Sequence, residues 1–142
     1  MITALLNWIN RVFDRPDLAK LLLRLSIAML LFHGFHKLEY GIGGIQQMLV
    51  AYGLPAYVGD GVYVGEIIAP ILIVLGVLCR PAAIFMMGTM VVAWLMVDID
   101  ATFQVDRVGA WAIENLMFYF MMGAVLLFCG PGRYSLGSPT WR

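Results

Sequence analysis

Among the ionisable side chains inside otherwise apolar stretches of the sequence, four could share one site. They are His33, Lys37, Glu66 and Glu114. Carboxylates and an imidazole can accept and donate protons, while an ammonium can neutralise a nearby carboxylate. We expect the four side chains to line one polar pocket that binds a small molecule or passes protons. What they can do depends on whether lipid, protein or water surrounds them.

The composition is that of an integral membrane protein. Of the 142 residues, 62% are hydrophobic and 13% are charged, and the mean hydropathy is +0.87. A soluble domain is about 45–50% apolar and about 25% charged. The nine basic and nine acidic residues cancel, so no overall field attracts nucleic acid. The lipid bilayer is therefore the expected partner, and nucleic acid is not.

Four apolar runs are long enough to cross a bilayer, which takes about 20 residues of helix. They cover residues 18–37, 61–79, 81–99 and 109–130. Ahead of them, apolar residues recur at helical spacing in residues 1–17, with polar residues on the other side, as in a helix that lies on the membrane. The predicted fold class is an all-α membrane protein, a four-transmembrane-helix bundle with an N-terminal interfacial amphipathic helix.

Basic residues gather at one set of helix ends. Seven of the nine lie near the two termini or in the turn between the second and third spans. By the positive-inside rule, both termini then face the cytoplasm. The loop 38–60 faces outward and is expected to contain a short helix in "IQQMLVAY", whereas "CRPAA" forms a tight inner hairpin. The expected organisation is an interfacial segment at 1–17, a four-span domain at 18–137 and a tail at 138–142.

The same geometry places the candidate side chains at one level in the membrane. At 1.5 Å per residue, Glu66 and Glu114 lie about 7–8 Å below the outer boundary and His33 lies about 6 Å below it. His33 and Lys37 share a helix face, and Pro70 leaves the carbonyl of Glu66 without its helical donor. Lipid penalises such groups, so they should point inward. Two interpretations stay open: a functional pocket, or ion pairs that fasten the helices together.

Other polar and sulfur-containing residues are expected to be structural. Arg24 is about 13 Å from His33 along the axis and half a turn out of phase, so it either reaches the inner headgroups or pairs within the inner half of the bundle. Cys79 and Cys129 lie on the reducing side without a CxxC motif and are expected to be free thiols. The methionines of the last two spans are expected to fill packing gaps. Motifs for nucleotides, haem, zinc and serine hydrolysis do not occur.

Short motifs spread over about residues 21–137 together resemble the DoxX family of four-span bacterial membrane proteins. The pattern has an arginine early in span one, H-G-x-x-K at its end, G-L-P in the outer loop, V-G-E in span two, L-x-R at the inner turn and G-P-G-x-x-S-L near the C-terminus. In this chain the motif residues are Arg24, His33-Gly34-Lys37, Gly53-Leu54-Pro55, Val64-Gly65-Glu66, Leu78-Arg80 and Gly130-Pro131-Gly132-Ser135-Leu136. The first twenty residues and the loop "DIDATFQVDRVG" fall outside the pattern.

The resemblance implies a multi-pass protein of the bacterial inner membrane that serves a quinone-linked redox system, in sulfur metabolism or oxidative stress. It implies a quinone as the cofactor, with His33, Lys37, Glu66 and Glu114 holding its headgroup or a small substrate and moving protons. A redox or assembly partner protein and a homo-oligomer are the expected protein partners. The alternative is a non-enzymatic protein that assembles or stabilises another membrane protein. A small transporter is the weakest of the three, because paired inverted repeats and broken helices are not evident in the sequence.

Overall fold

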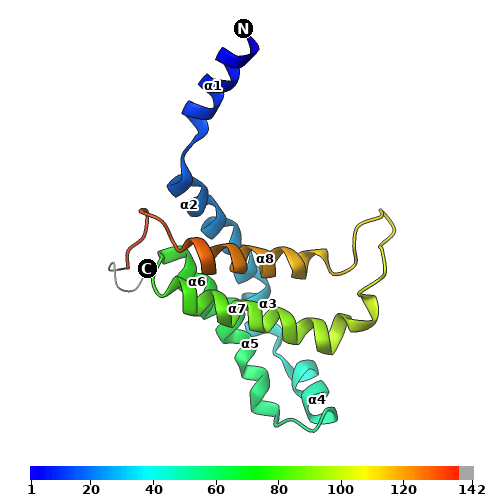
Figure 1. Ribbon diagram of the computed structural model, residues 1–142. Helices are drawn as coiled ribbons and strands as arrows, with labels where there is room; N and C mark the ends of the chain where they lie inside the picture. The colour runs from blue at the N-terminus through cyan, green and yellow to red at the C-terminus, as the bar shows by residue number, and fades with distance from the viewer. Residues whose placement is uncertain (138–142) are drawn as a thin grey trace.

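The computed structural model describes residues 1–137, so the predicted tail at 138–142 lies outside the described residues. Apart from one isolated β-bridge between Val105 and Trp111, the regular structure of the described part is helical. The protein is an all-α membrane bundle, as the apolar runs predict (Figure 1). In chain order its elements are α1 (Ile2–Phe13), α2 (Pro16–Ile27), α3 (Leu30–Tyr40), α4 (Gly43–Ala51), η1 (Ala56–Asp60), α5 (Gly61–Tyr63), η2 (Val64–Ile68), α6 (Ala69–Leu75), α7 (Cys79–Ala93), η3 (Trp94–Asp98), η4 (Ile99–Ala101) and α8 (Glu114–Cys129).

Three helical runs are long and apolar enough to cross a membrane. They are Pro16–Tyr40, Ala56–Leu75 and Cys79–Ala101, with 25, 20 and 23 residues. The fourth apolar helix, α8, has 16 residues and is therefore about 24 Å long. A bilayer core is about 30 Å thick, so α8 alone is shorter than the hydrocarbon layer.

The start of the fourth span differs from its predicted position at residue 109. Gly109 has a φ of +85°, and the carboxylate of Asp106 accepts hydrogen bonds from the amides of Val108 and Ala110. These bonds hold a turn where the sequence suggested a helix, because side-chain acceptors compete with helical hydrogen bonding. Helix α8 consequently begins at Glu114, which is the first residue of the helix and not the sixth.

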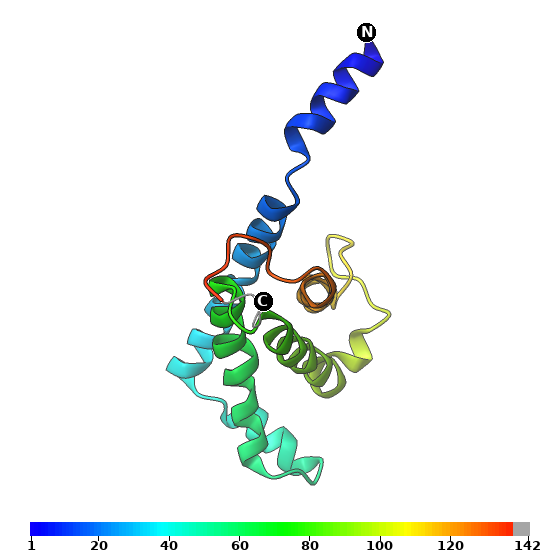
Figure 2. The ribbon, with the colours of Figure 1, turned by 60° about the vertical axis from the view of Figure 1, so that its left-hand side comes forward.

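The four apolar helices meet in one core. Helices α7 and α8 lie side by side, and the runs formed by α2–α3 and by η2–α6 cross them (Figures 1 and 2). The core residues come from all four, and they are Ile27, Leu30, Ala69, Ile73, Ala82, Ala83, Met86, Met90 and Leu126. The burial of Met86 and Met90 confirms that these methionines pack in the core.

Helix α1 extends away from the bundle (Figures 1 and 2), and none of its residues is buried. Its apolar side includes Leu5, Trp8 and Val12, while Arg11 lies in its last turn. An amphipathic helix joined to the end of a membrane span can bury such an apolar side in the headgroup region. The structure thus shows an unburied helix at this end of the chain, and its place at the membrane surface stays a prediction.

One connection of the bundle follows the sequence pattern and the other is shifted. Helix α4 forms in the long loop, as "IQQMLVAY" predicts. At the other end α6 stops at Leu75, and α7 starts at Cys79. Between them Gly76 and Leu78 have φ values of +77° and +49°, left-handed conformations that reverse the chain within a few residues. The segment "CRPAA", predicted as the inner hairpin, is the start of α7, and the turn precedes it.

Candidate ligand site

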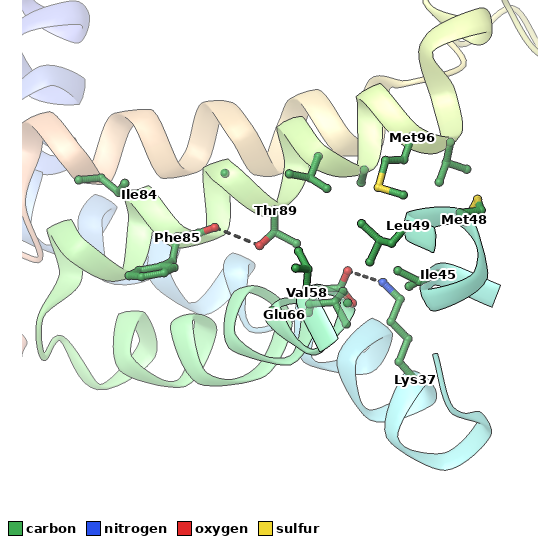
Figure 3. Close-up of a pocket in the computed structure, with 17 residues that line it drawn as sticks. Lys37, Ile45, Met48, Leu49, Val58, Glu66, Ile84, Phe85, Thr89 and Met96 are labelled. Atoms are coloured by element: carbon green, nitrogen blue, oxygen red, sulfur yellow. Dashed lines mark hydrogen bonds and ion pairs between the residues drawn. The ribbon is translucent and has the colours of Figure 1, made fainter. Parts of the chain in front are cut away.

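Lys37 and Glu66 form an ion pair between the first and second spans. The ammonium of Lys37, near the end of α3, donates a hydrogen bond to Oε1 of Glu66 in η2 (Figure 3). Glu66 is 5% exposed. Its second carboxylate oxygen, Oε2, is buried and has no hydrogen-bond partner among the described residues. A buried charged oxygen without a donor is uncommon, because its lost hydration is then not replaced.

Two backbone features bring this pair together. Residues Val64–Ile68 form a π-helical turn, in which the amide of Ala69 donates to the carbonyl of Val64. Pro70, which lacks an amide proton, follows directly and cannot donate to Glu66. A wider turn of this kind changes the direction of the side chains that it carries, and such turns often occur at functional sites.

Gly34 allows α3 to approach this turn closely. A Cβ atom at Gly34 would meet the side chain of Ile67 and would lie 2.8 Å from the carbonyl oxygen of Glu66. The hydroxyl of Tyr63 also donates to the carbonyl oxygen of Lys37 at 3.3 Å. The close contact between spans one and two therefore explains why the H-G-x-x-K motif has a glycine at this position.

A cavity of about 420 Å³ lies beside the ion pair. We call it the Glu66 pocket. Its lining comes from the end of α3, from α4 and η1, from the start of the second span, and from α7 and η3 (Figure 3). The polar side chains of the lining are those of Lys37, Glu66 and Thr89. The hydroxyl of Thr89 already donates to the carbonyl oxygen of Phe85 at 3.0 Å. Binding sites for small molecules commonly have this size and this apolar character.

One side of the Glu66 pocket is a continuous row of residues on the third span. We call this row the α7 stripe, and its members are Ile84, Phe85, Gly88, Thr89, Val92, Ala93, Met96 and Val97. The spacing of i, i+1, i+4 and i+5 is that of one helix face. A Cβ atom at Gly88 would meet no atom within 4 Å, so this glycine leaves the groove open.

The structure brings two of the four predicted site residues together. His33 and Glu114 are not part of the lining of the Glu66 pocket. The exposed ring of His33 makes an edge contact with Tyr119 of α8, with ring centroids 6.4 Å apart. The half-buried side chain of Glu114 makes no hydrogen bond or ion pair with the described residues. Its place in the first turn of α8 suits a negative charge, because the helix dipole favours anions there.

Arg24 belongs to a different polar cluster at the opposite end of the second span. Arg24 is 2% exposed, and its guanidinium donates to the carbonyl oxygens of Ile73 at 2.8 Å and Pro131 at 3.0 Å. It also donates to the carbonyl oxygens of Val74 and Tyr134. Of the two roles considered for Arg24, the structure shows the internal one: it ties α2 to the end of α6 and to the segment after α8.

The remaining candidate groups do not form a metal or disulfide site in the described part of the chain. Cys79 is buried and Cys129 is exposed, and both are free thiols. No three histidine, cysteine or acidic side chains among residues 1–137 lie close enough together to hold a metal ion.

The α7 stripe was not predicted from the sequence. The methionines of this span were expected only to fill packing gaps, whereas Met96 lines the pocket. A signal was present in the small residues Gly88 and Ala93, which lie on the same face as Thr89. Small residues on a membrane helix allow close approach of another helix or of a ligand. Which of the two occurs depends on the neighbouring helix, which periodicity does not reveal.

The fold and the site together define a class: an all-α membrane bundle in which a half-buried lysine pairs with a buried carboxylate beside an apolar cavity. The family model described as DoxX matches residues 19–99, more than half of the chain. The protein belongs to the DoxX family. The match includes Lys37, Glu66 and the α7 stripe, whereas α1, α8 and the G-P-G-x-x-S-L segment lie outside it. No curated protein and no solved structure matches the chain.

Proposed function

We propose that this DoxX-family protein is the membrane subunit of a quinone-linked redox system and that the Glu66 pocket binds the quinone headgroup. The observation that supports this proposal is Oε2 of Glu66, a buried carboxylate oxygen without a hydrogen-bond partner on a side chain that lines an apolar cavity. A hydroquinone carries hydroxyl donors on an apolar ring, so one hydroxyl can supply the missing hydrogen bond. The family resemblance points to the same chemistry, in a sulfur or oxidative-stress system.

Lys37 and Glu66 have complementary tasks in this proposal. The ammonium of Lys37 holds one oxygen of Glu66, which leaves the other oxygen for a ligand hydroxyl. The other N–H groups of the Lys37 ammonium can donate hydrogen bonds to a ligand carbonyl. When bound, the quinone supplies the electron transfer, and Glu66 is the group that accepts or returns the proton. Electrons come from or go to a redox partner protein.

We infer that the protein lies in the bacterial inner membrane with both termini in the cytoplasm, so that α4 and the Glu66 pocket are in the outer half. The split of the basic residues supports this orientation. The test uses single cysteines at the exposed positions Gln47 in α4 and Asn10 in α1, each in a Cys79→Ser, Cys129→Ser background. A membrane-impermeant maleimide added to intact cells should label the first and not the second. The reverse labelling would contradict the orientation.

The function is tested by measuring the quinone that co-purifies with the protein in mild detergent. We expect about one quinone per chain with the natural protein and loss of at least tenfold with Glu66→Gln. Glu39→Gln changes an exposed carboxylate on the same helix as Lys37 and should retain the quinone. Folded natural protein without quinone would contradict the proposal. A stoichiometric polypeptide in its place would support the alternative, a non-enzymatic assembly protein.

A further inference from the structure

We propose that the α7 stripe holds the apolar tail of the ligand whose headgroup binds at Glu66. The site then takes a membrane-resident amphiphile with a hydrogen-bonding head and a long tail, and it does not take a water-soluble substrate. This inference rests on the proposed function and specifies its substrate class. Three observations carry it: the length of the groove, the position of its polar groups, and the open end of the groove.

The groove is much longer than a headgroup needs. The α7 stripe runs from Ile84 to Val97, and 13 helical steps correspond to about 20 Å. An aromatic headgroup with its substituents would occupy only part of this length. The rest of the stripe needs another occupant, and a flexible apolar chain fits a narrow row of apolar side chains.

The polar groups are gathered toward one end of this groove. Figure 3 shows Lys37 and Glu66 on the side where α4 lies, while Ile84 and Phe85 lie at the other end of the row. The polar end is covered by α4 and η1, where Leu49 is 2% exposed and packs close to Gly59. A ligand bound here has its head under this cover and its remaining length along α7.

The other end opens on the surface of a membrane-spanning helix. Ile84 and Phe85 are 56% and 62% exposed, and they belong to the candidate span Cys79–Ala101. Side chains exposed at this depth contact lipid in a membrane. The space at Gly88 connects this end with the polar end. A tail can therefore pass from the hydrocarbon phase into the groove without crossing water.

The lining also selects against a water-soluble substrate. Such a molecule would lose its hydration and find one carboxylate oxygen, one ammonium group and a threonine hydroxyl that is already bonded. Unpaired polar groups in an apolar site carry a substantial penalty. A tail that moves from lipid into an apolar groove carries no such penalty, because lipid is as apolar as the groove.

The test uses photo-crosslinking in nanodiscs of phosphatidylethanolamine and phosphatidylglycerol. The probe is a hydroquinone with a long isoprenoid-like tail that carries a diazirine in its distal half. After irradiation, mass spectrometry locates the labelled residues. We expect labelling around Ile84 and Phe85, and we expect excess unlabelled hydroquinone of the same tail length to prevent it.

Two matched variants test the groove itself. Gly88→Phe places a ring where the structure has open space and should lower labelling at Ile84 and Phe85 at least tenfold. Val91→Phe adds the same ring beside the stripe, at an exposed residue outside the pocket lining, and should leave labelling unchanged. A phospholipid with the same diazirine tail should label the stripe much less than the hydroquinone probe does.

The outcomes separate the two proposals. If labelling resists competition and survives Glu66→Gln, the proposed function fails. If labelling depends on Glu66 but maps to α4 or to residues such as Val91, and Gly88→Phe has no effect, only the tail groove fails. Equal labelling of the stripe by the phospholipid probe would overturn the tail groove as well, because it would then be a general lipid contact.

Discussion

The ammonium of Lys37 and the carboxylate of Glu66 join two membrane helices through Oε1 of the carboxylate, and Oε2 has no partner among the described residues. One oxygen therefore has a structural partner, and the other is the atom to which the proposed function assigns a ligand. The two interpretations that the sequence left open, a fastener and a pocket, are compatible at this pair. Variants that change one partner at a time can separate them.

Removal of Lys37 should destabilise the protein through Glu66. Lys37→Met leaves a buried carboxylate without its ammonium, and breaking such a pair typically lowers the free energy of unfolding by about 3 kcal/mol. Unfolding in detergent, followed by circular dichroism, gives this quantity. Adding Glu66→Gln to the variant should recover more than half of the loss, since the stranded charge is then gone. Equal stability of natural protein and Lys37→Met would show that the pair contributes nothing to folding.

Arg24→Lys should lower stability although the positive charge remains. Arg24 donates to four carbonyl oxygens on two segments of the chain, whereas the three donors of a lysine cannot reproduce this planar arrangement. Hydrogen bonds to charged groups contribute about 1.5–3 kcal/mol each, so we expect a loss of at least about 2 kcal/mol. Arg11→Lys on the exposed α1 is the control and should change nothing. An Arg24→Lys protein as stable as this control would contradict the proposed tie.

Gly34→Ala should separate the first two spans. The added Cβ would clash with Ile67 and with the backbone carbonyl of Glu66, and overpacking of this kind lowers the free energy of unfolding by about 1–3 kcal/mol. Because the shift moves Lys37 away from Glu66, quinone retention should fall too. Gly44→Ala adds the same atom in α4, where nothing lies within 4 Å, and should be neutral or stabilising. Retention and stability at natural levels in Gly34→Ala would exclude the close contact.

Glu114→Gln should affect stability slightly and quinone retention not at all. The residue lies outside the pocket lining and at the start of α8, where a negative charge is favourable by about 0.5 kcal/mol. Unfolding and quinone content measured on the same preparations give both quantities, with Glu66→Gln as the comparison. A loss of quinone as large as that of Glu66→Gln would show that Glu114 takes part in binding and would support a pocket of four residues.

The membrane helices could be predicted from the sequence because lipid imposes a simple rule on length and hydropathy. The beginning of α8 could not. There, the side chain of Asp106 binds two backbone amides, and a local competition between turn and helix does not alter the hydropathy. The carbonyl partners of Arg24 could likewise not be predicted from the sequence, since the ends of α6 and α8 meet only in the folded chain.

The direction in which the candidate site residues point could not be predicted from the sequence. Counting residues places His33, Glu66 and Glu114 at similar levels, but it says little about rotation around each helix axis. The π-helical turn Val64–Ile68 changes the direction in which the Glu66 side chain points. The late start of α8 changes the direction of the Glu114 side chain in the same way. Two side chains at the same level therefore face a common pocket only where the irregular turns of their helices direct both of them toward it.

In the proposed function, Oε2 of Glu66 accepts a hydrogen bond from the bound headgroup. Infrared difference spectroscopy of the protein in nanodiscs, with and without a long-tailed hydroquinone, measures this directly through the carboxylate stretching bands. We predict a carboxylate band that shifts on binding in the natural protein and in Glu39→Gln, and that is missing from the difference spectrum of Glu66→Gln. Hydroquinone binding with no carboxylate shift, or the same shift in Glu66→Gln, would contradict the account.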